Sequence, residues 1–362
     1  MHLLYCVTAH GYGHLAQSVP ILDALRTRLP RLRLTMRTGL PEALVRERLA
    51  GDYDVIADPD DFGFVMRDAL SIDDEASLAR YRALHAGAER RLRADCEQLT
   101  RLGVDLVFTN IGHAPLAAAG ALGLPAFAAS SLNWADLLEA LYADRADYAG
   151  GLAPVVADMR AGYAAARIVF ELVPGMPFDR FANRQRVEPI ARRGVARPGP
   201  LRRALGVPDA TRVLLVAFGG APMPLDTAHW RLPEGCAAVV FAPQVVESPA
   251  VRDASRLGWS FIDLLASCDV LVTKPGYGTF AEAGFAGRDT LIVPRDVWPE
   301  SPYLSRWLQG HARCVELDVA RLRRGDFGAA LQALDGLPAC PPARGDGARQ
   351  IADAVAGALS RP

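Results

Sequence analysis

Short apolar runs of the β type alternate with helical patterns along the 362 residues of this chain. In the first half the apolar runs cover residues 3–8, 32–38, 105–109 and 126–130, with helical patterns at about 17–29, 42–49 and 115–122. Residues 76–102 have the pattern of one long amphipathic helix. Strands that alternate with helices indicate βαβ units and a parallel sheet. The chain is therefore expected to be an α/β protein.

The same alternation starts again in the second half of the chain. Its apolar runs cover residues 212–218, 237–242, 270–273 and 290–293, with helical patterns at 280–285 and 347–359. Between the halves, residues 174–200 contain five prolines and little periodicity, which is typical of a linker. A chain of this length favours two domains over one. We therefore predict an N-terminal domain over 1–170, a linker over 171–205, a C-terminal domain over 206–345, and a final helix over 346–362 that packs back on the lobe interface.

Composition argues against several functional classes. The chain is 51% hydrophobic and 22% charged, which is the balance of a globular protein and not of a disordered one. Its formal net charge of −1 and its dispersed arginines give no electrostatic footprint for nucleic acid or anionic lipid. Its six cysteines are scattered without a C-x-x-C pair, and no apolar stretch reaches membrane-spanning length. We expect a soluble cytoplasmic protein with reduced thiols, and the sequence does not indicate an oligomeric state.

Three glycine-rich turns follow predicted strands, at residues 10–14, 218–220 and 274–279. In an open parallel sheet, ligands bind beyond the carboxyl ends of the strands, where such turns point backbone N–H groups outward. None of the three fits the dinucleotide G-x-G-x-x-G pattern or the P-loop G-x-x-x-x-G-K-[ST] pattern. The usual NAD and ATP sites are therefore disfavoured.

The third turn, Lys274-Pro-Gly-Tyr-Gly-Thr279, has the features of an anion site. Glycines allow the backbone to approach an anion, the N-terminus of the following helix adds positive potential, and Lys274 adds a full charge. Lys274 is also the one lysine among the 40 basic residues of the chain. A diphosphate is the natural ligand of such a turn. The alternative is structural, because Thr279 and Glu282 fit the S/T-x-x-E capping box of a helix.

The residues around this turn also carry a family resemblance. Segments 263–265 and 268–282 resemble the donor site of GT-B glycosyltransferases, whose fold consists of two Rossmann-like parallel-sheet lobes facing across a cleft. The chain is most similar to the glycosyltransferase-like N-terminal domain of plant L-arabinokinases and its bacterial stand-alone relatives. Further matching segments span nearly the whole chain: 10–14, 62–73, 123–125, 133–134, 218–220 and 295–304.

The resemblance implies a nucleoside diphosphate sugar, of the UDP type, as the donor. It implies that Glu282 contacts the ribose, that the neighbouring turn holds the diphosphate, and that Glu300, with Asp296 as its rival, faces the sugar hydroxyls. The expected donor-binding residues are Gly13, Gly219, Gly220, Phe261, Lys274, Gly276, Tyr277, Gly278, Thr279, Glu282, Asp296 and Glu300.

Transfer with inversion also needs a general base on the acceptor hydroxyl. His14 occupies the position of the histidine base of the inverting enzymes, at the start of a helix, and His10 is the reserve candidate. Many related enzymes support this histidine with an aspartate, whereas the matching strand here ends in Asn110. Because an amide carries no charge to stabilise imidazolium, Asp73 stays open as an alternative base, and His113 is a weaker candidate.

No metal is expected at these positions. Residues 58–61 contain a D-x-D string, which is interpreted as an acidic turn, and no His/Cys cluster has metal-ligand spacing. We therefore predict an inverting, metal-independent glycosyltransferase that needs no redox cofactor and moves a sugar from a nucleoside diphosphate to an unidentified acceptor in the N-terminal lobe. The alternatives are a nucleotide-sugar epimerase or hydrolase on the same fold, and a non-catalytic nucleotide-sugar sensor.

Overall fold

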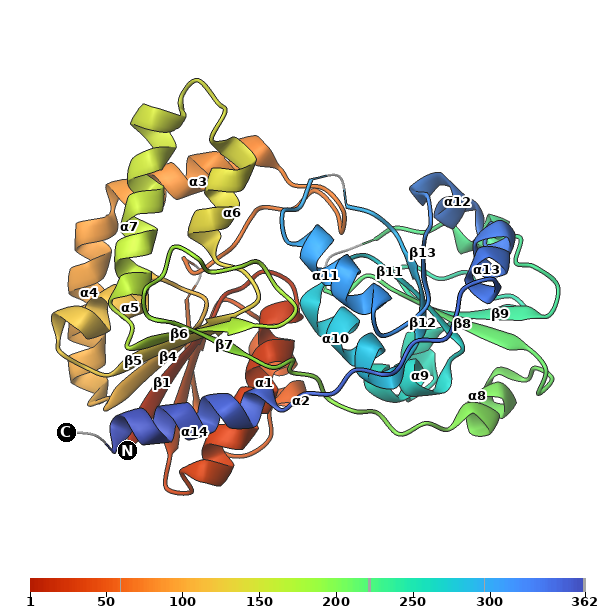
Figure 1. Ribbon diagram of the computed structural model, residues 1–362, viewed down its shortest axis with the longest axis horizontal. Coiled ribbons are helices and arrows are strands. Elements are labelled where there is room, and N and C mark those ends of the chain that lie inside the picture. Colours follow the sequence, from red (N-terminus) through yellow and green to blue (C-terminus); the bar gives the residue numbers. More distant parts are fainter. Residues whose placement is uncertain (59, 221–222, 296, 361–362) are drawn as a thin grey trace. The chain divides into compact units, whose positions relative to one another are not determined.

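The computed structural model describes residues 1–58, 60–220, 223–295 and 297–360, which form two compact units (Figure 1). Unit 1 consists of Met1–Val65, Ile72–Ile190 and Gly345–Pro362. Unit 2 consists of Met66–Ser71 and Ala191–Arg344. The segment 171–205, expected as a linker, contains a strand of unit 1 and a helix of unit 2, and the chain passes between the units after Ile190.

Unit 1 is built on a parallel sheet of seven strands in the order β3-β2-β1-β4-β5-β6-β7. The central strands are buried on both faces, which explains why they are continuous apolar runs without polar alternation. The strands are β1 (His2–Val7), β2 (Arg33–Thr38), β3 (Asp54–Ala57), β4 (Leu106–Asn110), β5 (Ala126–Ser130), β6 (Ile168–Leu172) and β7 (Arg184–Val187).

Helices cover both faces of this sheet (Figure 1). The last one, α14, belongs to unit 1, where it packs against α1. The helices of the unit are α1 (Gly13–Arg28), α2 (Glu42–Arg48), α3 (Asp74–Ala86), α4 (Ala88–Leu102), α5 (Ala114–Ala121), α6 (Trp134–Tyr142), α7 (Ala153–Ala164) and α14 (Gly347–Leu359), with a π-helical turn at Tyr148–Leu152.

The prediction of one long helix over residues 76–102 is wrong. Gly87 ends α3 and begins α4, and its backbone angles, φ −98° and ψ 5°, lie outside the helical range. Glycine gains the most chain entropy by leaving a helix, so a short break there has a low cost. The break therefore divides residues 74–102 into two separate helices of unit 1, α3 and α4.

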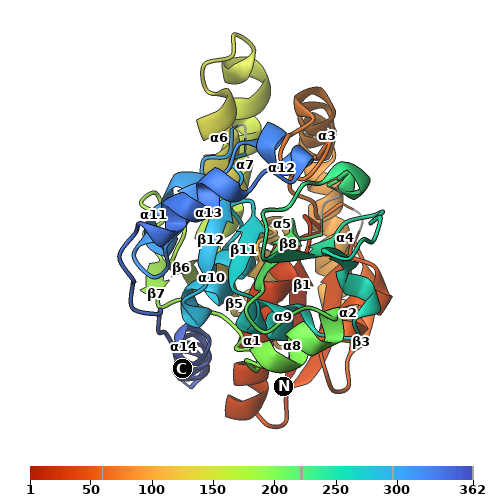
Figure 2. The ribbon, with the colours of Figure 1, turned by 90° about the vertical axis from the view of Figure 1, so that its right-hand side faces the viewer.

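Unit 2 repeats the architecture with a six-stranded parallel sheet in the order β10-β9-β8-β11-β12-β13. Figure 2 shows its strands β8, β11 and β12 side by side. Its strands are β8 (Arg212–Ala217), β9 (Cys236–Phe241), β10 (Val251–Asp253), β11 (Val270–Thr273), β12 (Asp289–Ile292) and β13 (Cys314–Glu316). Its helices are α8 (Pro198–Leu205), α9 (Phe261–Ser267), α10 (Tyr277–Ala286), α11 (Ser301–Gln309), α12 (Val319–Arg324) and α13 (Gly328–Asp335), with 3₁₀ turns at Thr227–His229 and Ala254–Arg256. Among the described residues, no helix of either unit has the length and apolar character needed to cross a bilayer.

A short segment from the first half of the chain, Met66–Ser71, belongs to unit 2. Its Ala69 is fully buried in the hydrophobic core of that unit, together with Val216 and Val240. On either side of the segment, two residues of unit 1 are joined by a hydrogen bond: the Asp73 N–H donates to the Val65 carbonyl over 2.8 Å. The segment is therefore a fixed part of the second core.

Candidate active site

The strand order of each sheet places the predicted site residues at a point where ligands commonly bind. In unit 1, β1 lies between β2 and β4, and in unit 2, β8 lies between β9 and β11. At such a switch in strand order, the loops that follow the two adjacent strands diverge and leave a crevice at the carboxyl edge of the sheet. The turns after β1 and β8, and those after β4 and β11, carry most of the predicted residues. Each unit thus carries its own group of predicted residues, which we call the half-site of that unit.

His14 is the second residue of α1, and its side chain is buried. Its Nδ1 lies 2.7 Å from the Asn110 Oδ1 at the end of β4. Since an amide oxygen only accepts, Nδ1 carries the proton and Nε2 keeps the lone pair. Burial lowers the pKa of His14 to about 4, against the opposing effect of the Asn110 hydrogen bond. The imidazole is therefore neutral at physiological pH, with Nε2 as its basic atom.

A chain of buried amides fixes the orientation of Asn110. Its Nδ2 donates to the Gln17 Oε1 over 2.9 Å, and the Gln17 Nε2 donates in turn to the Ser131 Oγ over 3.0 Å. Each donor is thereby matched to an acceptor, so that a flip of either amide would oppose two acceptors or two donors. Gln17 lies one turn along α1 from His14, and sequence reasoning missed it. We call His14, Asn110, Gln17 and Ser131 the amide relay.

His10 has the opposite tautomer. Its Nδ1 accepts from the Phe64 N–H over 3.2 Å, so in the neutral ring the proton lies on Nε2. The lone pair that a base needs is therefore engaged by the backbone. Trp134 packs against the rings of both histidines, with each pair of ring centroids 5.3 Å apart. Of the two candidates, the geometry favours His14 as the base.

The two remaining candidates have local roles in unit 1. Asp73 caps the N-terminus of α3, where its Oδ1 accepts from the Ala76 N–H over 3.1 Å. Such a cap typically stabilises a helix by about 1 kcal/mol. His113 precedes α5 and lines a cavity of unit 1. Its role as a base and that of Asp73 stay predictions.

Asp58, the first residue of the acidic string, belongs to a buried ion network. Asp58 pairs with the Arg37 Nε over 2.8 Å and with the Arg91 Nη2 over 3.0 Å. Asp61 is also buried and accepts from the Thr8 hydroxyl over 2.8 Å, and burial followed by the proximity of Asp58 raises its pKa to about 7. Within the described part of the chain, no three His, Cys, Asp or Glu side chains form a group that could hold a metal ion.

In unit 2, α10 begins at Tyr277, which is earlier than the sequence pattern indicated. Its N-cap is Gly276, which has extended backbone angles and no side chain to satisfy the N–H groups of the first turn. Thr279 therefore lies inside the first turn, and the capping-box explanation of Thr279 and Glu282 is wrong. Gly276, Tyr277, Gly278 and Thr279 together form an uncapped helix N-terminus with positive potential.

Two cations and one carboxylate lie beside this helix end. The Lys274 Nζ would be 3.8 Å from a Cβ placed on Gly276, which puts the amine next to the start of α10. Burial, and then the charge of Arg295, lower the pKa of Lys274 to about 7, while Glu300 opposes this shift. Burial likewise lowers the pKa of Arg295 to about 10. The charged form of both groups is therefore disfavoured by burial, and a bound anion would favour it.

Arg295 is the second residue that sequence reasoning missed, although it opens a matched segment. Its guanidinium stacks over the Trp298 ring at 3.8 Å from the centroid, and its Nε is buried without a hydrogen-bond partner among the described residues. The Trp298 indole N–H donates to the Glu300 Oε2 over 3.1 Å. Glu300 is thus a buried carboxylate that holds Trp298. Asp296, its predicted rival, lies outside the described residues.

The other predicted donor residues lie on the same half-site or near it. Gly219 follows β8 with a φ of +73°, a conformation that favours glycine, and Gly220 completes the turn. The Glu282 carboxylate is buried on α10 and lies 4.0 Å from the Arg192 Nε. Phe261 begins α9 and packs edge-on against Phe241, with ring centroids 6.1 Å apart. Gly13 begins α1 and so belongs to the half-site of unit 1.

Comparisons with known sequences identify a curated relative from a plant. No protein-family model matches the chain. An L-arabinokinase of Arabidopsis thaliana is 26% identical over 353 residues, which cover 93% of this chain and 32% of that protein. The chain thus spans about a third of the length of this relative.

Solved structures of glycosyltransferases resemble the chain over nearly its whole length. The glycotransferase of kitacinnamycin has a TM-score of 0.61 at 17% identity, covering 99% of this chain and 94% of that one. A UDP-glucosyltransferase from Polygonum tinctorium capable of glucosylating indoxyl has a TM-score of 0.60 at 15% identity, covering 100% and 99%. A UGT transferase from Siraitia grosvenorii in complex with UDP has a TM-score of 0.56 at 12% identity, covering 99% and 100%. The chain therefore has the GT-B fold of the glycosyltransferases, and an L-arabinokinase is among its relatives in sequence.

Proposed function

We propose that this protein is a glycosyltransferase that moves a sugar from a nucleoside diphosphate, of the UDP type, to the hydroxyl of an acceptor. The observation that carries the proposal is the cluster of Lys274 and Arg295 at the uncapped N-terminus of α10. Helix N–H groups, an amine and a guanidinium are the donors that bind diphosphate elsewhere in proteins. The GT-B fold and a solved relative that binds UDP support the same donor.

In this proposal the half-site of unit 2 binds the donor and stabilises the leaving group. Negative charge develops on the diphosphate as the bond between the sugar C1 and the phosphate oxygen breaks. The first-turn N–H groups of α10 and the charged Lys274 would accept this charge. Glu282 would contact the ribose, as the resemblance implies. The reaction as proposed needs no metal ion, because two cationic side chains would already face the diphosphate.

The half-site of unit 1 supplies the base. His14 Nε2 takes the proton from the acceptor hydroxyl while the acceptor oxygen forms its bond to C1 and the diphosphate leaves from the opposite face. The anomeric centre is inverted by this single displacement. Because the amide relay holds Nδ1 protonated, the proton can be accepted at Nε2 alone. The imidazolium that forms is stabilised by the Asn110 dipole and not by a full charge.

Calorimetry with UDP tests the donor half-site. Lys274→Ala should weaken UDP binding by about 1–3 kcal/mol, the scale of one charge-assisted hydrogen bond. Arg306→Ala, which removes an exposed cation on α11, is the control and should leave the affinity unchanged. Because the pKa of Lys274 is about 7 before binding, the amine should take up a proton at pH 8 when the diphosphate arrives. Titrations in buffers of different ionisation enthalpy measure this uptake, which Lys274→Ala should abolish.

The same experiment can contradict the proposal. If a folded Lys274→Ala variant bound UDP as tightly as the wild type, the proposed anion site at α10 would be contradicted. Turnover of UDP-glucose and related donors over a panel of acceptors decides the reaction type. Release of UDP with water as the sole acceptor would identify a hydrolase, and tight donor binding without any turnover would identify a sensor.

A further inference from the structure

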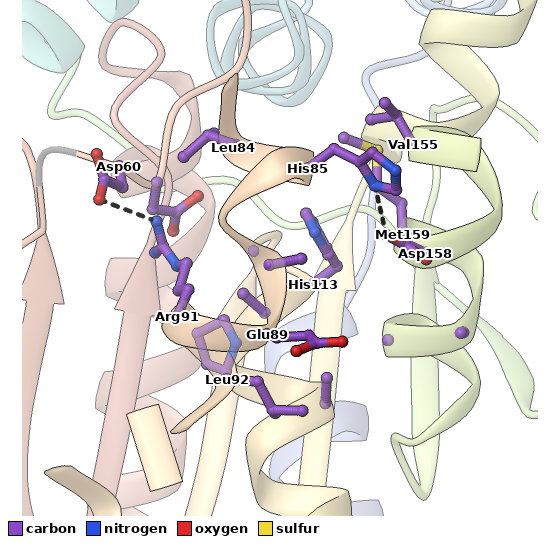
Figure 3. Close-up of a pocket in the computed structure, with 18 of the residues that line it drawn as sticks. Asp60, Leu84, His85, Glu89, Arg91, Leu92, His113, Val155, Asp158 and Met159 are labelled. Atoms are coloured by element: carbon purple, nitrogen blue, oxygen red, sulfur yellow. Dashed lines mark ion pairs between the residues drawn. The ribbon is translucent and has the colours of Figure 1, made fainter. Parts of the chain in front are cut away.

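Unit 1 contains a cavity of about 870 Å³ whose lining residues have no role in the proposed mechanism (Figure 3). Helices α3, α4, α5 and α7 form its walls, and every residue that lines it belongs to unit 1. The volume lies within the range of about 300–1,000 Å³ that is typical of small-molecule sites. Neither His10 nor His14 lines the cavity, although Trp134, which packs against both rings, does.

The walls of the cavity are mainly apolar. They include aliphatic side chains from four helices and the aromatic rings of Trp134 and Phe62. Alanines such as Ala117 leave room between them, because a methyl group fills little of the space. The aliphatic lining residues are Leu84, Leu92, Pro115, Val155 and Met159. Such walls favour an occupant with a large apolar surface.

Four ionisable residues of the wall, Arg91, Asp60, His85 and Asp158, are already paired. Arg91 lies 3.0 Å from a carboxylate oxygen of Asp58 and 3.5 Å from one of Asp60, and His85 lies 2.6 Å from one of Asp158 (Figure 3). An anionic or cationic occupant would have to compete with these contacts and lose its own hydration without compensation. A charged group is therefore disfavoured in the part of the cavity beside these two sets of ion pairs.

His113 places one polar group inside the cavity. Its imidazole lies among the lining side chains of α4 and α7 (Figure 3). Among the described residues, its ring nitrogens make no hydrogen bond, and its ring contacts Tyr163 with centroids 6.1 Å apart. Burial, followed by the charge of Arg91, lowers the pKa of His113 to about 4, so the ring is neutral near pH 7. A neutral imidazole offers one donor and one acceptor, which suits a hydroxyl group.

We propose that this cavity is a second ligand site, which binds an uncharged, mainly apolar molecule through one hydroxyl group that hydrogen-bonds to His113. The apolar walls, the paired ions and the open imidazole together define this class of ligand. The site is separate from the donor half-site in unit 2, so it stands or falls independently of the proposed transfer reaction. Trp134 lies against both the cavity and His14, which places an occupant one indole ring away from the proposed base.

Three naphthalene probes that differ in one group test the proposal on the full chain. Fluorescence and calorimetry should show that 2-naphthol binds and that 2-naphthoate, its anionic counterpart, binds at least about tenfold more weakly because a buried charge lacks compensation. Naphthalene itself measures the contribution of the apolar walls. His113→Phe should weaken 2-naphthol binding by about threefold to tenfold, the loss of one neutral hydrogen bond, and leave naphthalene binding within about twofold.

Two variants in which phenylalanine replaces an alanine locate the bound probe. Ala117→Phe places a ring in the cavity and should abolish binding of both 2-naphthol and naphthalene. Ala164→Phe adds the same ring at an exposed position of α7 that does not line the cavity, and should leave binding unchanged. The proposal is overturned if no probe binds, if 2-naphthoate binds as tightly as 2-naphthol, or if a folded Ala117→Phe variant binds as the wild type does.

Discussion

A carboxamide, and not a carboxylate, holds the imidazole of His14. Asn110 can fix the ring as well as an aspartate could, because its oxygen still accepts from Nδ1 over 2.7 Å. It cannot supply the negative charge that would favour imidazolium in a buried place. The consequence is a base that stays neutral to unusually low pH and gains little help when it becomes charged.

The variant Asn110→Asp tests whether the missing negative charge keeps the pKa of His14 low. The new charge should raise the pKa of His14 by about 1–3 units from its value of about 4, since an opposite charge favours the protonated ring. His14 acts as a base only when deprotonated, so the activity of the wild type should be lost as pH falls through about 4, whereas the acid limb of the variant should lie higher. NMR titration of the His14 ring measures the pKa, and the pH dependence of kcat reports the limb.

Two further variants separate positioning from chemistry. His14→Ala should lower the rate by about 10²–10⁴ with donor affinity nearly intact, the usual effect of removing a general base. Asp73→Asn should keep near wild-type turnover if Asp73 is the α3 cap alone. A His14 pKa that stays at about 4 in the Asn110→Asp variant would contradict the amide relay. If Asp73→Asn lost turnover and His14→Ala kept it, Asp73 would be the general base in place of His14.

At the scale of elements, two glycines at the ends of α4 have different conformations. Gly87 has a φ of −98°, which any residue can adopt, and Gly103 has a φ of +59°, which favours glycine. A Cβ on Gly87 would meet its nearest neighbour at 3.6 Å, an ordinary contact, and a Cβ on Gly103 would meet nothing within 4 Å. Backbone conformation alone therefore distinguishes the two positions.

Alanine at the two positions should change stability in opposite directions. Gly87→Ala should raise the free energy of unfolding by about 0.4–1 kcal/mol, because it restricts the unfolded chain without native strain. Gly103→Ala should lower it by about 1–2 kcal/mol, because the left-handed conformation is strained for a residue with a Cβ. Urea denaturation of both variants measures the difference. Destabilisation by Gly87→Ala would mean that the break between α3 and α4 needs glycine for a reason other than chain entropy.

The elements that the sequence predicts well are those with strong apolar runs. The bounds of β5, β11 and α14 agree with the prediction, because each is a continuous buried strand or a strongly periodic helix. β7 was missed because three of its four residues, in Arg184–Val187, are exposed and polar at the edge of the sheet. α10 begins earlier than predicted because its N-cap is an extended glycine with no capping side chain to mark it.

The site was predictable to the extent that motifs carry it. The turns after β1 and β11, with His14 and Lys274, follow from glycine spacing and resemblance. Gln17 and Arg295 could not be found in the same way. Gln17 acts through Asn110, which is distant in the sequence, and Arg295 acts through its contact with Trp298 in a loop. The tautomers of His10 and His14 likewise follow from hydrogen bonds that only three-dimensional structure reveals.

At the scale of the whole molecule, the chain passes between the two units after Val65, Ser71, Ile190 and Arg344. The first two crossings enclose Met66–Ser71, which is anchored in unit 2 by Ala69. Asp68 holds the segment in shape by accepting from the Leu70 and Ser71 N–H groups over 2.8 and 2.9 Å. Unit 2 therefore needs a piece of sequence that lies more than 100 residues before the rest of it.

Ala69→Gln should destabilise unit 2 in particular. The longer polar side chain would enter a fully closed core, which costs about 1–3 kcal/mol for overpacking, in addition to any unpaired amide. Hydrogen exchange should then show lower protection of β8 and β11, with the strands of unit 1 much less affected. Arg67→Gln, on an exposed neighbour in the same segment, is the control. Equal loss of protection in both units would mean that the two cores do not unfold separately.

This interwoven connection limits how such a protein can be recombined. Judged by the long segments alone, genetic exchange of the second lobe between homologous chains needs two crossover points, at about residues 191 and 344. A hybrid made in that way would keep its old 66–71 segment and insert it into a foreign core. An exchange of unit 2 should therefore succeed only when residues 66–71 are exchanged together with residues 191–344. The two units look modular, but they cannot be recombined independently.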